Sequence, residues 1–238
     1  MNKCLVIVSD MNYIQHAKYL FSSAKNVGKW NGDMCLVCNG VDDKTKREFM
    51  NKGIHILDLP KDINPFFAKL YLFDTYFKRW DKMCYFDVDF VFTGDINGIV
   101  SEGEFLVDVE PFNVHQYFDK DANPKLFNEL KSEIDVDSFG FNSGCMVYDT
   151  EIITDTSVSE LLAYMEKYKE INHHTGLDEG TDQPILNIMF HRQLKQINGV
   201  AFHLKRKQDT VAMHTCRWHA PWKDQRYIQQ YNHYLSMF

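Results

Sequence analysis

The sequence has no apolar run long enough to cross a membrane, and it does not begin with a secretory signal pattern. It also lacks an excess of basic residues: 26 Lys and Arg stand against 33 Asp and Glu, for a formal net charge of −7. A broad nucleic-acid-binding face needs clustered Lys and Arg. We therefore expect a cytoplasmic protein with no transmembrane segment and no nucleic-acid partner, in which an anionic ligand needs a local cation.

The sequence also lacks the two CxxC motifs that a zinc site of the CxxC…CxxC type would need. Cys35 and Cys38 form one CxxC spacing inside the strand-like run MCLVCNG, but no second CxxC follows. A structural zinc site needs more ligands than this. We expect the six cysteines to be free thiols, mostly buried, in a reducing compartment. The sequence also has no internal repeat, low-complexity tract or linker, which favours one domain over residues 1–238.

The first half of the chain alternates strand and helix patterns. Strands are predicted at 3–10, 33–40, 54–60 and 82–92, and helices at 11–26, 42–52 and 64–80. An apolar stripe supports the last helix, with Phe66, Leu70, Phe73, Phe77 and Trp80 on one side. This order predicts an α/β fold with a Rossmann-like, mostly parallel central sheet flanked by helices. Ligands of such sheets collect at the carboxyl ends of the strands.

The second half is less regular. Strands are predicted over EFLVDVE, FNSGCMVYD, VAFHLK and VAMHTC, and helices over 156–171 and over TDQPILNIMFH. Pro184 falls in the first turn of the second helix, where proline is tolerated. The C-terminal residues are expected to form a helix with Trp222, Ile228, Tyr231 and Leu235 on one side.

Two carboxylates stand inside an apolar strand pattern. Asp87 and Asp89 interrupt YFDVDFVF, and burying an unpaired charge is costly. Residues two apart in a strand point the same way, so these oxygen donors form half of a site for Mg²⁺ or Mn²⁺. Alternatively, both pair with Lys or Arg, or the strand end is exposed to water. From these residues alone, the alternatives remain open.

Five segments, in order along the chain, resemble the glycogenin-type glycosyltransferases, which are retaining, DxD-containing enzymes with a GT-A fold. The segments are VIVSDMNY, AKLYLFDTYFKRWDKMCYFDVD, FNSGCMVYD, EGTDQPILN and HTCRWHAPW. They span nearly the whole chain, and the last keeps the His, Pro and Trp of the family's HxxGxxKPW. The resemblance implies a GT-A domain with a nucleotide-binding half over 1–92 and a half for donor sugar and acceptor over 93–238.

The resemblance also implies a metal site and a nucleotide site. Asp87, Asp89 and His214 would bind Mn²⁺ or Mg²⁺. The implied nucleotide contacts are Ser9, Asp10 and Tyr13 at uracil and ribose, the Val88 backbone at the ribose, and Lys69 at the diphosphate or a neighbouring acid. Without the motifs, Tyr13 belongs to an apolar helix stripe, Lys69 is a solvated residue, and His214 is an ordinary core or surface histidine.

A third implied site holds the donor sugar. Asn142, Ser143 and Gly144 would line it, since glycine lets the backbone approach a ligand closely. Glu179 stands where the family often has a sugar-binding acid. Asp182 and Gln183 would lie near the anomeric carbon, which makes Asn142, Asp182 and Gln183 the catalytic candidates. Without the resemblance, both segments have an ordinary structural explanation: NSG is a turn into a strand, and Asp182 is an acid favoured at a helix N-terminus.

The last segment departs from the family pattern at two positions. Arg217 and Ala220 stand where the family has Gly and Lys, and that Lys neutralises the leaving diphosphate. Arg217 or Lys223 could replace it.

The implied function is metal-dependent transfer of a sugar from a UDP-sugar donor, with retention, to a glycan, a lipid-linked glycan or a protein acceptor. One alternative is a nucleotide-sugar-binding protein with little or no catalysis. Another is a haloacid dehalogenase-type phosphatase, because DVDFV fits the pattern DxDx[TV]. That motif normally ends the first strand of its domain, whereas three predicted strands precede it here.

Overall fold

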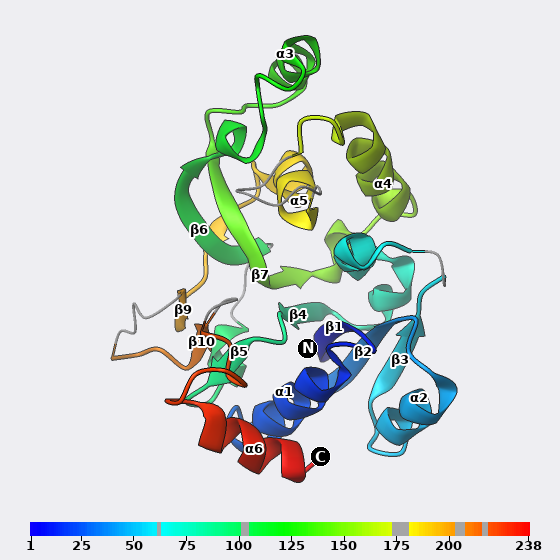
Figure 1. The fold of residues 1–238 in the computed structure, drawn as a ribbon, viewed down its shortest axis with the longest axis vertical. Helices are drawn as coiled ribbons and strands as arrows, with labels where there is room; N and C mark the ends of the chain where they lie inside the picture. Colours follow the sequence, from blue (N-terminus) through cyan, green and yellow to red (C-terminus); the bar gives the residue numbers. More distant parts are fainter. Residues whose placement is uncertain (61–62, 101–104, 173–180, 203–207, 216–218) are drawn as a thin grey trace.

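A mixed seven-stranded sheet forms the centre of the molecule in the computed structural model, which describes the chain except for residues 61–62, 101–104, 173–180, 203–207 and 216–218 (Figure 1). The strand order is β3-β2-β1-β4-β7-β6-β8. The strands are β1 (Lys3–Asp10), β2 (Asp33–Asn39), β3 (His55–Asp58), β4 (Lys82–Phe86), β6 (Phe105–Asn113), β7 (Phe139–Asp149) and β8 (Lys195–Gln196). Neighbours pair in parallel except at β7, which runs against both β4 and β6. The predicted Rossmann-like, mostly parallel sheet is confirmed.

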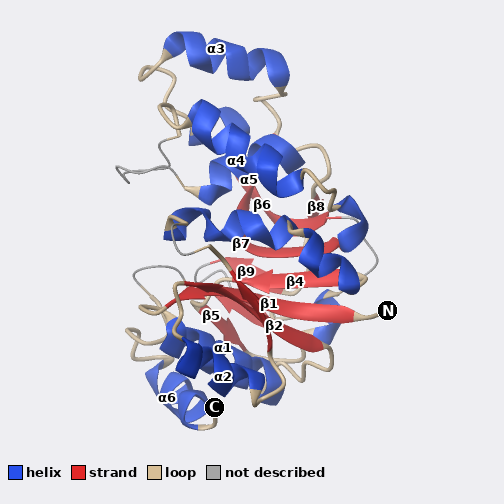
Figure 2. Cartoon of the chain, turned by 90° about the vertical axis from the view of Figure 1, so that its right-hand side faces the viewer, coloured by secondary structure: helices blue, strands red, loops and turns tan. Residues whose placement is uncertain are grey.

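Helices cover both faces of this sheet, as Figure 2 shows. One face is covered by α1 (Ile14–Asn26), α2 (Asp43–Met50) and the C-terminal α6 (Ile228–Ser236). The other face is covered by the 3₁₀ helices, α4 (Ser157–Tyr168) and α5 (Asp182–Phe190), with α3 (Pro124–Glu133) farthest from the sheet. Within the described residues, no helix is both long and apolar enough to span a bilayer.

The helix predicted over 64–80 is wrong in type. The structure has two 3₁₀ helices, η1 (Pro65–Phe73) and η2 (Thr75–Arg79), and the side chain of Asp74 caps the second by accepting from the Tyr76 N–H at 2.7 Å. In a 3₁₀ helix, residues three apart share a face. The pairs Leu70 with Phe73 and Phe77 with Trp80 therefore stay buried, although the path between them differs from an α-helix.

The single strand predicted over 82–92 is also wrong, because the chain changes sheets within it. β4 ends at Phe86, and β5 (Phe90–Phe92) joins a second, three-stranded sheet with the order β5-β10-β9. Its other strands are β9 (Val200–Phe202) and β10 (Ala212–His214). The residues between β4 and β5 thus lie at the junction of two sheets rather than inside one.

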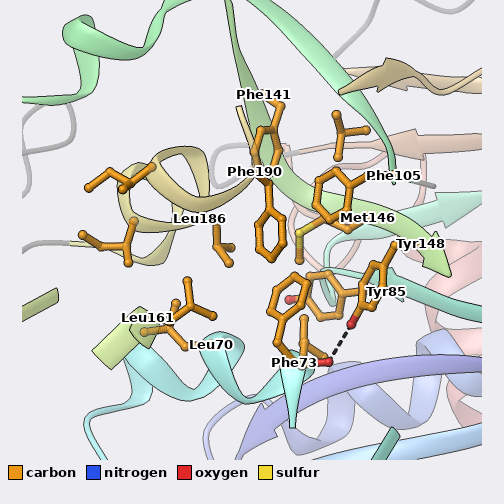
Figure 3. Close-up of a cluster of buried hydrophobic side chains, with 14 of the residues drawn as sticks. Leu70, Phe73, Tyr85, Phe105, Phe141, Met146, Tyr148, Leu161, Leu186 and Phe190 are labelled. Carbon is orange, nitrogen blue, oxygen red and sulfur yellow. Dashed lines mark hydrogen bonds between the residues drawn. The ribbon is translucent and has the colours of Figure 1, made fainter. Parts of the chain in front are cut away.

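The larger core lies between the seven-stranded sheet and the layer of η1, α4 and α5. Its centre is a group of stacked rings, with Phe73 4.5 Å from Phe190 and 4.9 Å from Tyr148 (ring centroids). Figure 3 shows these rings together with Tyr85 and Phe105. The buried Tyr148 hydroxyl donates to the Leu72 carbonyl at 2.6 Å. This packing fixes η1 against β4 and β7, and so fixes the side chains that reach the ends of those strands.

Candidate active site

The junction between the two sheets brings three metal-ligating side chains together. Asp87 follows β4, Asp89 precedes β5, and His214 ends β10, whose register pairs it with Phe90. His214 Nε2 lies 3.1 Å from Asp89 Oδ1 and 3.9 Å from Asp87 Oδ2, and one ligand atom from each residue falls within 4.8 Å of the others. Two carboxylates and an imidazole are suitable donors for Mn²⁺ or Mg²⁺.

Short contacts hold this junction in place. The His214 ring stacks on Phe90 with centroids 4.7 Å apart. Thr215 donates to the Asp89 carbonyl twice, from its N–H at 3.2 Å and from its hydroxyl at 2.6 Å. The Asp87 N–H donates to the Gly144 carbonyl at 2.8 Å. All three candidate ligands are therefore positioned by backbone and ring contacts.

The charges at the site favour a divalent cation. Burial raises the pKa of Asp87, and the nearby Lys69 ammonium offsets this only in part. Burial acts on Asp89 in the same direction, but the charge and hydrogen bond of His214, a backbone hydrogen bond and the charge of Lys69 together leave the pKa of Asp89 lowered. Among the described residues, Asp87, Asp89 and the neighbouring Asp182 face one cationic side chain, Lys69, so negative charge exceeds positive charge there while His214 is neutral. The donor set and this charge excess both fit a divalent ion.

Lys69 links the metal residues to the predicted sugar residues. Its ammonium lies 3.2 Å from Asp87 Oδ1, 3.1 Å from Asp182 Oδ2 and 3.2 Å from Ser143 Oγ. Burial alone would lower the pKa of Lys69, but the charges of Asp182 and Asp87 raise it well above its usual value. Lys69 stays protonated, so it does not activate Ser143 as a base activates a nucleophile.

A cleft of about 520 Å³ opens beside these residues at the carboxyl ends of β1 and β4. It is lined by Val8, Ser9, Asp10, Tyr13, Asn39, Pro65, Ala68, Lys69, Tyr85, Asp87, Val88 and Asp182. The nucleotide residues predicted from the sequence, Ser9, Asp10, Tyr13, Lys69 and Val88, thus line one cavity. Asn39 and Tyr85 were not predicted, although Asn39 ends its strand as Asp10 does.

The turn that carries Tyr13 is shaped by Asp10. Asp10 Oδ1 accepts the N–H groups of Asn12 at 2.9 Å and Tyr13 at 3.0 Å. Tyr13 remains 49% exposed, which leaves its ring available to a ligand. The alternative interpretation, that Tyr13 is a buried member of the apolar helix stripe, is therefore wrong.

The predicted sugar residues lie on β7 and at the start of α5. Gln183 Oε1 accepts the Ser143 N–H at 3.1 Å, and the Ser143 hydroxyl donates to Asp182 Oδ2 at 2.7 Å. Asn142 Oδ1 accepts the Gly144 N–H at 2.9 Å. The five residues Asn142, Ser143, Gly144, Asp182 and Gln183 therefore meet in one hydrogen-bonded group.

Gly144 is close to His214 rather than to an open space. A Cβ atom at Gly144 would lie 2.4 Å from His214 Cε1. The missing side chain makes room for the third candidate metal ligand, which is a different reason for glycine from the ligand approach expected above.

Glu110 of β6 is a site residue that the sequence analysis missed. Its Oε2 accepts from Gln183 Nε2 at 3.0 Å and from the Tyr117 hydroxyl at 2.5 Å, and its Oε1 lies 3.5 Å from Asn142 Nδ2. The signal was present in EFLVDVE, where an acid ends the predicted strand as in VSD and DVD. Asn187 of α5 supports the same group, since its amide holds the Phe141 backbone at 2.8 and 3.0 Å.

One predicted nucleotide residue, Lys223, is not brought to the cleft. Lys223 is exposed in the turns before α6 and does not line the cleft. The adjacent Trp222 was predicted in the C-terminal helix, but it lies before α6 begins at Ile228. Trp222 stacks on His16 of α1 with centroids 3.6 Å apart. Burial, followed by the charge of Lys223, lowers the pKa of His16 to about 4. Glu179 and Arg217 lie outside the described residues.

The sequence profile of glycosyl transferase family 8 matches residues 4–204. The chain belongs to glycosyl transferase family 8. This family comprises retaining glycosyltransferases that bind a nucleotide-sugar donor and an acceptor and typically use a divalent metal. Family membership confirms the predicted enzyme class and the GT-A fold, and it excludes the dehalogenase-type phosphatase.

Solved glycosyltransferase structures share the fold. The galactosyltransferase LgtC, solved with donor and acceptor sugar analogues, is 14% identical with a TM-score of 0.66, over 99% of this chain and 96% of LgtC. GlyE from Streptococcus pneumoniae TIGR4 is 18% identical with a TM-score of 0.65, over 100% of this chain and 61% of GlyE. Mouse xyloside xylosyltransferase 1 is 12% identical with a TM-score of 0.55, over 90% and 97%. The chain has no significant match among curated proteins.

Proposed function

We propose that this family 8 enzyme transfers a sugar from a UDP-sugar to a hydroxyl of a glycan, a lipid-linked glycan or a protein, with a divalent ion held by Asp87, Asp89 and His214. The observation that carries the proposal is that Asp87 belongs both to the metal cluster and to the lining of the cleft. A nucleotide in that cleft has its phosphates beside the metal residues. A bound ion supplies the positive charge that stabilises the departing diphosphate.

The chain itself supplies the contacts for the nucleotide. Ser9, Asp10 and Tyr13 hold uracil and ribose at the end of β1, and the Val88 backbone faces the ribose. Lys69 adds one positive charge next to the diphosphate. Fixed charges that face developing charge lower the barrier because they need no reorganisation during the reaction.

Asp182, Gln183 and Asn142 act on the sugar in this proposal. Ser143 and Lys69 hold the Asp182 carboxylate at 2.7 and 3.1 Å, so its negative charge is fixed in orientation. That charge stabilises the positive charge that develops at the anomeric carbon. Gln183 and Asn142 are oriented by Ser143, Gly144 and Glu110, and they bind the sugar hydroxyls.

In this proposal the acceptor occupies a second cleft of about 550 Å³, which Glu110 lines. This cleft is lined by Asp108, Val109, Glu110, Pro111, Phe112, Gln196, Ile197, Asn198, Gly199, Val200, Ala201, Asp209 and Thr210. Glu110 lines it and also contacts Gln183 and Asn142, so this cleft adjoins the predicted sugar residues at that carboxylate. Its oxygens can orient the acceptor hydroxyl toward the sugar.

One observation favours the alternative of a nucleotide-sugar-binding protein with weak catalysis. Among the described residues that line the first cleft, Lys69 is the one basic side chain, and Ala220 replaces the family lysine. Hydrolysis of a UDP-sugar by the purified protein separates the two functions, because a protein that only binds releases no UDP.

The metal and the nucleotide are tested together by thermal shift. UDP is expected to raise the melting temperature strongly with Mn²⁺ and much less with EDTA, because a ligand that binds only the folded state stabilises it. GDP and CMP are the matched control nucleotides and are expected to give smaller shifts. Equal UDP shifts with Mn²⁺ and with EDTA would overturn the metal assignment, and a larger shift with GDP would overturn the choice of base.

A further inference from the structure

Tyr85 is buried beside the candidate metal site, and nothing above assigns it a role. It lies in β4, two residues before Asp87, and is 2% exposed. Its hydroxyl donates to Oδ1 of Asp87. The Lys69 ammonium lies 5.3 Å from the centre of the Tyr85 ring, so ring and ammonium both adjoin the same carboxylate.

The two oxygens of Asp87 have different surroundings. Oδ1 takes the Tyr85 hydroxyl and lies 3.2 Å from Lys69. Oδ2 lies 3.9 Å from His214 Nε2, on the side of the metal cluster, and 3.5 Å from the Lys69 ammonium. Lys69 thus reaches both oxygens, and the Tyr85 hydroxyl is the contact that Oδ1 has and Oδ2 lacks. The hydroxyl therefore fixes the rotation of the carboxylate and leaves Oδ2 directed toward the other two ligands.

We propose that Tyr85 is a positioning residue for the metal site, which holds Asp87 so that Oδ2 is presented to the ion together with Asp89 and His214. The proposal rests on the proposed function, because it needs a metal at these residues. Hydrogen bonds from outside the coordination sphere orient metal ligands, and their loss typically weakens metal affinity by about 10- to 100-fold.

Packing alone does not account for the Tyr85 hydroxyl. Tyr148 on the neighbouring strand β7 is equally buried in the same core, and its hydroxyl is satisfied by the Leu72 backbone (Figure 3). Tyr148 thus shows what a purely structural tyrosine does in this core. The Tyr85 hydroxyl instead points at a side chain whose orientation decides the geometry of the candidate ligands.

The test compares Tyr85→Phe with Tyr148→Phe by calorimetric titration of the protein with Mn²⁺ alone. Tyr85→Phe is expected to bind Mn²⁺ about 10- to 100-fold more weakly than the parent. Tyr148→Phe is expected to keep the parental Mn²⁺ affinity while its melting temperature in EDTA falls. Lys69 still neighbours Asp87 Oδ1 in Tyr85→Phe, so the buried carboxylate keeps a partner and the variant is expected to fold.

A second readout is the increase in melting temperature that Mn²⁺ produces, which requires only a measurable transition. The increase is expected to shrink in Tyr85→Phe and to persist in Tyr148→Phe. Adding Tyr85→Phe to an Asp87→Asn background should weaken Mn²⁺ binding no further, because the hydroxyl acts through that carboxylate.

The outcomes separate this proposal from the proposed function. Parental Mn²⁺ affinity in Tyr85→Phe overturns the positioning role and leaves the metal site standing. Equal weakening in both tyrosine variants also overturns it, because the effect would then be a general loss of core packing. A parent protein that binds no Mn²⁺ overturns the metal site and the positioning role together.

Discussion

Two neighbouring regions of the site are built in opposite ways. The candidate metal side, Asp87, Asp89 and His214, gathers two carboxylates and an imidazole at a junction where, among the described residues, negative charge exceeds positive charge. The sugar side, Asn142, Ser143, Asp182, Gln183 and Glu110, is a closed group in which each side chain is hydrogen-bonded to another part of the group. Lys69 is the bridge between them.

The difference separates a region whose charges call for an added cation from a region whose polar groups are already satisfied by one another. A buried excess of negative charge is costly unless a cation balances it, so the metal side is arranged to receive an ion. A satisfied polar network is rigid, so under the proposed function the sugar side would orient its ligand without further change. Binding and catalysis should therefore respond differently to substitutions in the two regions.

The largest effect is expected on the metal side. Asp89→Asn removes the charge of a candidate ligand that no neighbour within the described part of the chain replaces, and Mn²⁺ affinity should fall by more than the roughly 100-fold typical of losing an outer partner. UDP affinity measured in Mn²⁺ should fall with it. Calorimetric titrations of Mn²⁺ and UDP check this, with Asp58→Asn as control, since Asp58 of β3 pairs with Lys46 of α2. If Asp89→Asn binds Mn²⁺ as tightly as the parent, the three residues do not act together as a metal site.

The next effect separates chemistry from binding on the sugar side. Asp182→Asn keeps the size of the side chain but removes its charge, so kcat for UDP-sugar hydrolysis should fall on the order of 100-fold, as for one transition-state contact. UDP affinity should change by less than about threefold. Measurements of UDP release and UDP binding test this.

Asp43→Asn is the matched control for Asp182→Asn, because Asp43 is also an acid in the first turn of a helix. If Asp182→Asn hydrolyses the donor as fast as the parent, Asp182 is only a helix-start acid. If Asp182→Asn loses UDP binding as fully as Asp89→Asn does, Asp182 belongs to the metal side, and the comparison between the two regions fails.

Substitutions of two glycines on β7 are expected to have the smallest effects on Mn²⁺ affinity and hydrolysis, and to distinguish the two sides most clearly. The Cβ in Gly144→Ala would lie 2.4 Å from His214, whereas that in Gly140→Ala would lie 2.3 Å from the Tyr117 ring that contacts Glu110. Gly144→Ala should weaken Mn²⁺ binding about 10-fold by displacing a ligand, and Gly140→Ala should slow hydrolysis while keeping Mn²⁺ affinity. Gly98→Ala is the control, since nothing lies within 4 Å of its added Cβ. If Gly144→Ala and Gly140→Ala change Mn²⁺ affinity and hydrolysis rate in the same way, the division into a metal side and a sugar side is contradicted.

The clustering of Asp87, Asp89 and His214 was predicted more fully than the details of the fold. Asp87 and Asp89 are recognisable because carboxylates interrupt an apolar run, and His214 is recognisable from its motif. The change of sheet between Phe86 and Phe90 was not predictable, because both strands are apolar and buried, and periodicity carries no information on which sheet a strand joins.

The 3₁₀ helices were missed for a related reason. Leu70, Phe73, Phe77 and Trp80 are spaced by three and four residues, which fits an α-helical stripe as well as two short 3₁₀ segments. Glu110 was missed although its sequence signal resembled that of Asp10 and Asp87. Its importance comes from Gln183 and Tyr117, which reach it from distant parts of the chain.

The hydrogen bonds from Thr215 to the Asp89 carbonyl have a consequence for chain entropy. They join residues 126 positions apart and so close the same loop that an ion held by Asp89 and His214 would close. Loop closure costs entropy that grows with the logarithm of loop length, and the folded protein has already met this cost through Thr215 and the β5–β10 pairing. Ion binding therefore adds its favourable free energy to a loop that is closed in advance.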